Sequence, residues 1–373
     1  MTVPRKIAVV TGSRAEWGLL SHVAHALAAR PDVALSIIAT GSHLEPKFGM
    51  TVDEIVSDGF VVEMRVPMSL AGERARDAVH AMARVTAGIA DALSEIAPDI
   101  VVLLGDRYEI LAAASAAAML GMPIAHIHGG ERTEGAIDDS IRHAITKLSH
   151  LHFAAARVYA DRIVQLGEEP DRVHVAGALG VDAIAKTERF DRAEIERRLG
   201  MRLGRPLLLV TYHPVTIEGA SGGAGVGAVV AALDRIDGAS IVITGVNADP
   251  AHAEIAARLD ELAQRHPGRI VLRQSLGQRL YVSVMAEADA VVGNSSSGVI
   301  EAPILGVPTV NIGDRQAGRL MPASVICCAA DADAITQAIR RAVSPEHRAA
   351  SRATTDFGAP GVGGRIAEIL ATA

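Results

Sequence analysis

Short runs of consecutive apolar residues alternate along the chain with longer segments whose apolar residues recur every three or four positions. Apolar runs without polar alternation are typical of strands buried on both faces of a parallel sheet, and the longer periodic segments are typical of helices. In the first half of the chain the predicted strands are residues 7–11, 35–40, 100–104, 123–127, 151–154 and 173–176. The first half is therefore predicted to form a doubly wound parallel sheet.

The same alternation resumes after a break in residues 177–189. The second series of predicted strands is 207–212, 240–244, 269–272, 290–292, 308–312 and 324–327. We therefore predict an α/β protein of two Rossmann-like domains that face a cleft, residues 1–177 and residues 190–345. Residues 346–373 are predicted to form a terminal helical segment, with a helix at 365–370 after the glycine-rich FGAPGVGG.

The composition of the chain bears on which ligands the protein binds and on where in the cell it is expected. The 373 residues, 49% of them hydrophobic, suffice for two cores, while a net charge of −7 and 3% aromatics argue against a nucleic-acid partner. The adjacent Cys327 and Cys328 make an awkward disulfide and lack clustered companions for a metal, so we expect reduced thiols, no metal and no cofactor. The apolar run near the N-terminus is too short for a signal peptide, and no run approaches a membrane span. We expect a soluble, cytoplasmic protein without a membrane partner.

Polar residues gather where the predicted strands of the first half end, which is where open α/β sheets bind ligands. Asp106, His128, Glu131 and Asp138 come from adjacent strand ends, and crowded acids are typical of acid–base chemistry. Asp106 and Asp138 also suit plain helix N-caps. In GSRAEWG, residues 12–18, the backbone amides and the side chain of Arg14 are suited to bind a phosphate or a sugar. The alternative is a tight turn with an acidic residue near a helix start.

The second half carries two comparable segments. His213 in TYHP ends the first predicted strand of that half, although a lone histidine is often structural. In GNSSSGVIEAP, residues 293–303, a strand-to-helix turn with Ser295, Ser296 and Gly298 suits a diphosphate, or the serine is only an N-cap. Glu301 would then accept the hydroxyls of a ribose, and Arg315 comes from the next strand end. The glycine-rich residues 219–227 are predicted to form a flexible lid.

Seven motifs along nearly the whole chain resemble the hydrolysing branch of the UDP-N-acetylglucosamine 2-epimerases, which serves sialic and nonulosonic acid synthesis. They are GSRAEWG, GDRYE, HIHGGE, DDSIRHAITKLSHLHF, HPVT, GNSSSGVIE and NIGDRQAGR. The resemblance implies a fold similar to the two-lobed GT-B glycosyltransferases, with UDP held mainly by the second lobe. It matches Asp106 and Asp138 to catalytic acids, His213 to the cleft histidine, and Ser295, Ser296, Glu301 and Arg315 to UDP contacts.

One position departs from part of the family, because some members have Glu where this chain has His128. Either His128 or Glu131 can therefore take the role of that acid. We also place Arg14, Arg107, Arg142 and Gly298 among the residues that bind the UDP-sugar.

The resemblance implies elimination of UDP from UDP-N-acetylglucosamine to a 2-acetamidoglucal, then addition of water to give N-acetylmannosamine. One alternative is the same chemistry on UDP-2,4-diacetamido-2,4,6-trideoxyglucose, also called UDP-N,N'-diacetylbacillosamine. Others are a non-hydrolysing epimerase that makes UDP-N-acetylmannosamine, a glycosyltransferase, and a non-catalytic sugar-nucleotide-binding protein. We further expect a homo-oligomer, a dimer or a tetramer.

Overall fold

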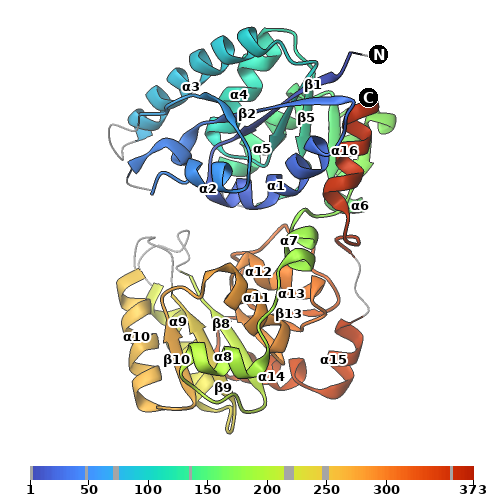
Figure 1. Ribbon diagram of the computed structural model, residues 1–373. Coiled ribbons are helices and arrows are strands. Elements are labelled where there is room, and N and C mark those ends of the chain that lie inside the picture. Colours follow the sequence, from blue (N-terminus) through green and yellow to red (C-terminus); the bar gives the residue numbers. More distant parts are fainter. Residues whose placement is uncertain are drawn as a thin grey trace. The chain divides into compact units, whose positions relative to one another are not determined.

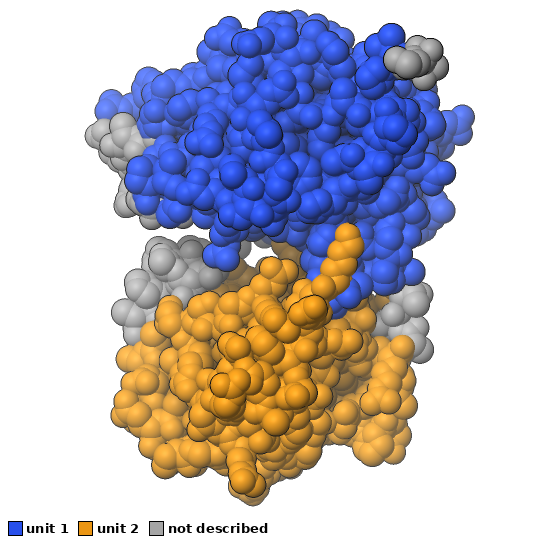
Figure 2. Space-filling model, in the orientation of Figure 1, with its two compact units in different colours: residues 1–185, 357–373 blue, residues 186–356 orange. Residues whose placement is uncertain are grey.

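The computed structural model describes residues 3–46, 49–69, 75–133, 137–213, 222–245, 252–352 and 356–373. They form two compact units, coloured separately in Figure 2. Unit 1 comprises Met1–Ala185 and Phe357–Ala373, and unit 2 comprises Lys186–Asp356. No helix in the described part of the chain is both long enough and apolar enough to cross a membrane.

Unit 1 is built on a seven-stranded parallel sheet in the order β3-β2-β1-β4-β5-β6-β7. Figure 1 labels β1, β2 and β5 of this sheet. The strands are β1 (Arg5–Thr11), β2 (Val33–Ala39), β3 (Val62–Arg65), β4 (Ile100–Leu104), β5 (Ile124–Ile127), β6 (Leu151–Ala154) and β7 (Val173–Val175). Its helices are α1 (Arg14–Ala28), α2 (Val52–Ser57), α3 (Ala75–Ile96), α4 (Tyr108–Met119), α5 (Ile137–Leu148), α6 (Arg157–Gln165), α7 (Gly180–Lys186) and α16 (Val362–Thr372), with short 3-10 turns at Gly41–Leu44 and Pro170–Arg172. The strand order reverses between β1 and β4, so their carboxyl ends flank the position where such sheets bind ligands.

Unit 2 repeats this architecture with six parallel strands in the order β10-β9-β8-β11-β12-β13. They are β8 (Leu207–Thr211), β9 (Ser240–Thr244), β10 (Ile270–Arg273), β11 (Ala290–Gly293), β12 (Thr309–Ile312) and β13 (Val325–Cys328). Its helices are α8 (Arg192–Leu199), α9 (Gly222–Asp234), α10 (His252–Arg265), α11 (Gly277–Glu287), α12 (Ser296–Val299), α13 (Glu301–Ile304), α14 (Ala332–Ala342) and α15 (Pro345–Ser351). The order reverses between β8 and β11. The predicted pair of doubly wound parallel sheets is confirmed.

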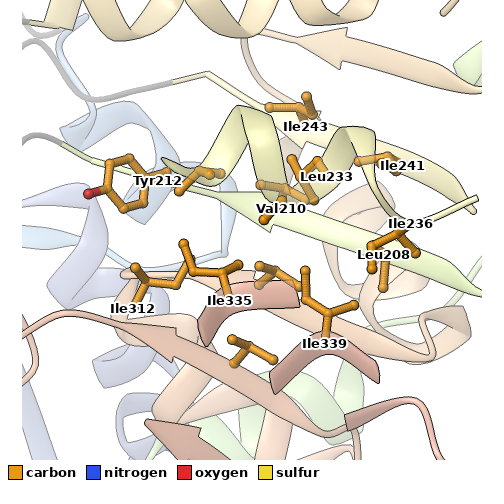
Figure 3. Close-up of a cluster of buried hydrophobic side chains, with 14 of the residues drawn as sticks. Leu208, Val210, Tyr212, Leu233, Ile236, Ile241, Ile243, Ile312, Ile335 and Ile339 are labelled. Carbon is orange, nitrogen blue, oxygen red and sulfur yellow. The ribbon is translucent and has the colours of Figure 1, made fainter. Parts of the chain in front are cut away.

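Burial on both sides of each sheet explains why the strands read as continuous apolar runs. All five residues of β4 and of β8 are buried. Figure 3 shows this packing in unit 2, where Leu208 and Val210 of β8 belong to one buried cluster with Ile335 and Ile339 of α14. The predicted lid is wrong for residues 222–227, which form the first turns of α9, and residues 219–221 lie outside the described part of the chain.

The C-terminal helix α16 returns to unit 1 and packs on α1. The carboxylate of Asp182, in α7, accepts hydrogen bonds from the backbone amides of Gly361 (2.6 Å), Val362 (3.1 Å) and Gly363 (2.8 Å). It thus satisfies the amides that a helix start leaves without partners. The sequence predicted one terminal segment over 346–373; the structure divides it, with α15 in unit 2 and α16 in unit 1.

Candidate active site

A pocket of about 440 Å³ opens at the carboxyl edge of the unit 1 sheet. Two cationic side chains line it, Arg14 from the first turn of α1 and Arg107 from the N-cap of α4. The remaining lining residues are Ser13, Ala15, Ser42, Thr51, Met68 and Tyr108. This pocket is suited to an anionic, hydrogen-bonding ligand, because it is lined by two arginines, three hydroxyl-bearing Ser and Thr side chains and two helix starts.

Asp106, the second residue after β4, is held by a buried arginine. Arg142 of α5, whose side chain is 4% exposed, donates to Asp106 Oδ2, and also to the Glu131 carbonyl oxygen at 3.0 Å and Thr133 Oγ1 at 3.2 Å. Burial raises the pKa of Asp106, the Arg142 guanidinium opposes this, and the carboxylates of Asp138 and Glu131 raise it further. Asp106 is therefore close enough to Asp138 and Glu131 for the charge of each to act on it.

His128 and Glu131 form a pair. His128 Nδ1 lies 3.1 Å from Glu131 Oε1, and His128 Nε2 accepts a hydrogen bond from the Leu179 amide at 3.3 Å. Because Nε2 accepts, a neutral His128 carries its hydrogen on Nδ1 and donates it to Glu131. The backbone of His128 has a φ of +64°, in the left-handed region, which turns the chain sharply into the two glycines that follow. His128 is thus engaged at both ring nitrogens.

His126 is buried in the sheet and supports the loop after β4. Its Nε2 donates to the Gly105 carbonyl oxygen at 2.8 Å, and its Nδ1 lies 3.2 Å from Thr146 Oγ1. Burial lowers the pKa of His126 to about 3, so the ring stays neutral. It fixes the backbone that carries Asp106.

In unit 2, Asn294 joins the ends of three strands. Its side chain makes a reciprocal pair with the backbone of His213: Asn294 Oδ1 accepts from the His213 amide at 2.7 Å, and Asn294 Nδ2 donates to the His213 carbonyl oxygen at 2.8 Å. The carbonyl oxygen of Asn294 accepts from Arg315 Nη1 at 3.1 Å and from Gln316 Nε2 at 2.8 Å. Sequence reasoning missed this role, although Asn294 stands inside the motif GNSSSG.

The serine-rich turn after β11 is organised by hydroxyl contacts. Ser297 Oγ lies 2.7 Å from the Tyr281 hydroxyl and 2.9 Å from Ser295 Oγ, while Ser296 begins α12. The single helix expected here is two short ones, α12 and α13, separated at Ile300. Gly298 is required by close packing, because a Cβ there would lie 2.8 Å from Thr309 Cγ2.

Glu301 is the first residue of α13. Burial raises the pKa of its carboxyl, and the positive charge of Arg319 opposes this. Among the residues that the structure describes, no partner reaches Glu301 Oε2. A buried carboxyl oxygen without a donor is suited to accept a hydrogen bond from a ligand hydroxyl.

The chain is similar to a known protein family and to characterised members of it. The family model for UDP-N-acetylglucosamine 2-epimerase matches residues 25–371. The hydrolysing GDP/UDP-N,N'-diacetylbacillosamine 2-epimerase of Campylobacter jejuni is 40% identical, with 86% of this chain and 84% of that protein covered. The hydrolysing UDP-N,N'-diacetylbacillosamine 2-epimerase of Legionella pneumophila is 35% identical, with 91% and 89% covered.

Solved structures agree on the fold. The UDP-GlcNAc 2-epimerase of Neisseria meningitidis, crystallised with UDP-GlcNAc, superposes with a TM-score of 0.80 at 18% identity, over 98% of this chain and 99% of that one. At 18% identity this likeness is evidence for the fold alone, whereas the family model and the two relatives are evidence for membership of the family. The chain belongs to the UDP-N-acetylglucosamine 2-epimerase family.

Proposed function

We propose that this protein is a hydrolysing 2-epimerase that converts a UDP-2-acetamido sugar and water into UDP and the free sugar of inverted configuration at C2. The observation that carries the proposal is the kinship with two relatives named as hydrolysing, at 40% and 35% identity over most of the chain. The meeting of Asp106, Glu131 and Asp138 in unit 1 supports it, because the reaction needs carboxylates.

The chemistry explains that need. No carbonyl group acidifies the proton on C2, so the C1–O bond to UDP must begin to break first, and the positive charge that develops at C1 makes that proton acidic. A carboxylate then stabilises the charge and accepts the proton, leaving a 2-acetamidoglucal. In the second half the oxygen of water bonds to C1 and a proton returns to C2 on the opposite face. Atoms and charge balance with one water consumed and one UDP released.

We assign the proton transfers at C2 to Glu131 rather than His128. His128 has both ring nitrogens engaged and directs one of them at Glu131 Oε1. That arrangement suits a residue that orients a carboxylate. Asp106, fixed by Arg142, and Asp138, in the first turn of α5, stabilise the charge at C1 or act as the second acid. We assign Arg142 the positioning of Asp106, and its binding of the UDP-sugar stays a prediction.

We assign UDP to unit 2, with Ser295, Ser296, Gly298 and Arg315 at the diphosphate and Glu301 at the ribose. Arg14 and Arg107 line the unit 1 pocket and contribute to binding of the sugar-phosphate end.

The proposal is tested by incubating the protein with each of two sugar nucleotides in deuterated solvent without an acceptor. We expect free UDP and a free sugar that carries deuterium at C2. Because the two relatives are named for UDP-N,N'-diacetylbacillosamine, we expect kcat/KM for this substrate to exceed that for UDP-N-acetylglucosamine by about tenfold or more, the scale of a few pocket contacts. A product that keeps its original C2 hydrogen contradicts elimination, and a product that keeps UDP identifies a non-hydrolysing enzyme.

Glu301→Ala is expected to weaken UDP binding by about 1.5–3 kcal/mol, because a ribose hydroxyl loses a charge-assisted hydrogen bond. The effect on kcat should be smaller. His213→Ala is the comparison within unit 2: it should lower kcat and leave UDP affinity nearly unchanged. Calorimetric titration of UDP into both variants measures the difference, and normal UDP binding by Glu301→Ala would refute the assignment.

A further inference from the structure

Two buried carboxyl groups that the proposed reaction does not use meet beside Arg107. Glu16 lies in the first turn of α1 and is 7% exposed, and Glu109 lies in the first turn of α4 and is fully buried. Arg107 Nε is 2.5 Å from Glu109 Oε1 and 3.8 Å from Glu16 Oε1. The backbone amide of Gly12 donates to Glu16 Oε2 at 2.7 Å.

The charges in this cluster do not balance if both acids are ionised. One guanidinium faces two buried carboxylates, and Asp106 adds a third negative charge nearby. A buried charge without a counter-charge is strongly unfavourable, so a group in this position takes up a proton instead. The hydrogen bonds point the same way. Within the described residues, no donor reaches Glu16 Oε1 or Glu109 Oε2, although both atoms are buried.

We propose that Glu16 and Glu109 hold one proton between them while the protein works, and that this singly ionised pair positions Arg107 at the pocket. The proton resides on Glu16, since Glu109 has the shorter contact with the guanidinium. Both unpartnered oxygens are acceptors when the two carboxyls are ionised, and a proton on Glu16 adds a hydrogen-bond donor to the cluster. Glu16 and Glu109 are positioning residues, and Arg107 is the group that they present to the ligand.

The surroundings of Glu16 support the protonated state. Burial, followed by the negative charge of Glu109, raises the pKa of Glu16 to about 8, against the opposing effects of the Gly12 amide and Arg107. The charged or titratable groups that face Glu16 are Glu109 and Arg107 from α4 and Asp106 from the end of β4. Glu16 is therefore neutral below about pH 8 and becomes an anion above it.

Ionisation of Glu16 is expected to weaken the binding of an anionic ligand in the pocket. A second carboxylate competes with Glu109 for the same guanidinium and adds a negative charge beside the pocket proposed for the sugar-phosphate end of the ligand. Low-dielectric surroundings make such a charge more effective than it would be in water. This consequence for binding rests on the proposed function, whereas the protonation state itself does not.

Infrared spectroscopy tests the protonation state without reference to activity. We expect the full-length protein at about pH 7 to show the carbonyl stretch of a buried carboxylic acid, and we expect this band to disappear on titration through about pH 8. Glu16→Gln should lack the band at every pH. A spectrum of Glu16→Gln identical to that of the wild type would overturn the proposal even if the protein hydrolyses no UDP-sugar.

Kinetics between about pH 6 and pH 9.5 test the positioning role. We expect the wild-type KM for the UDP-sugar to rise about tenfold above pH 8 while kcat changes little, and the KM of Glu16→Gln to show no such rise. Glu54→Gln is the matched control, because Glu54 pairs with Arg14 of the same pocket at 3.0 Å but is 44% exposed. It should keep the wild-type rise in KM. Parallel profiles for Glu16→Gln and the wild type would rule out the positioning role.

Discussion

Glu131→Gln is expected to lower kcat by about 10²–10⁴, the contribution of a general acid or base, and to leave UDP affinity close to that of the wild type. Glutamine keeps the shape of the side chain and still accepts the hydrogen bond from His128 Nδ1, so the loop should hold its conformation. What it loses is the capacity to take a proton from C2. Single-turnover kinetics with calorimetric titration of UDP separate the two effects.

His128→Asn is the matched comparison for Glu131→Gln. Asparagine tolerates the left-handed backbone at this position, but it is too short to reproduce both contacts of the histidine ring. We expect a loss in kcat of about tenfold, the lower scale of disturbed orienting partners. The assignment is wrong if His128→Asn is the inactive variant and Glu131→Gln turns over normally.

Gly293→Ala is expected to reduce the free energy of unfolding by about 4 kcal/mol or more, which places it among the exceptional single substitutions. Gly293 ends β11 with a φ of +141°, and a Cβ there would lie 1.9 Å from the carbonyl oxygen of Thr211 on β8. Neither strand can move away, since both are central in the unit 2 sheet and buried. Urea denaturation followed by circular dichroism measures the loss.

The control is Gly268→Ala. Gly268 also has a positive φ, +79°, but a Cβ added there would meet no atom within 4 Å. Gly268→Ala should reduce the free energy of unfolding only by the strain of a left-handed backbone, about 1–2 kcal/mol. Equal losses for the two variants would mean that backbone strain, and not the contact with Thr211, decides the result.

Strands could be predicted from the sequence wherever burial on both faces left no polar residue. The five residues of β4 are all buried, and their predicted bounds agree with the structure. The missed strand, β3, lies at the edge of the sheet and alternates half-buried and exposed residues, VEMR, so it lacks a continuous apolar run. The break at Ile300 between α12 and α13 was equally unpredictable, because it depends on the tertiary packing of a turn.

Site residues could be nominated from their places at strand ends, but their pairings could not. Arg142 reaches Asp106 across 36 positions of sequence, and Asn294 reaches His213 across 81. No local pattern encodes such distances. The sequence places Glu16 and Glu109 only at two helix starts, because an acid in a first turn has an ordinary local explanation.

The capping of α16 by Asp182 has a consequence for the order in which the protein can be made. Unit 1 is interrupted in sequence by all of unit 2, so its helix α16 is translated only after unit 2. At ordinary elongation rates of 5–20 residues per second, translation of residues 186–356 takes roughly 9–34 s. During that interval the α1 surface that receives α16 stays uncovered and the Asp182 carboxylate lacks its three amides. Unit 2 therefore has time to fold before α16 can pack on α1, and the fold of unit 1 is completed only after unit 2 has been translated.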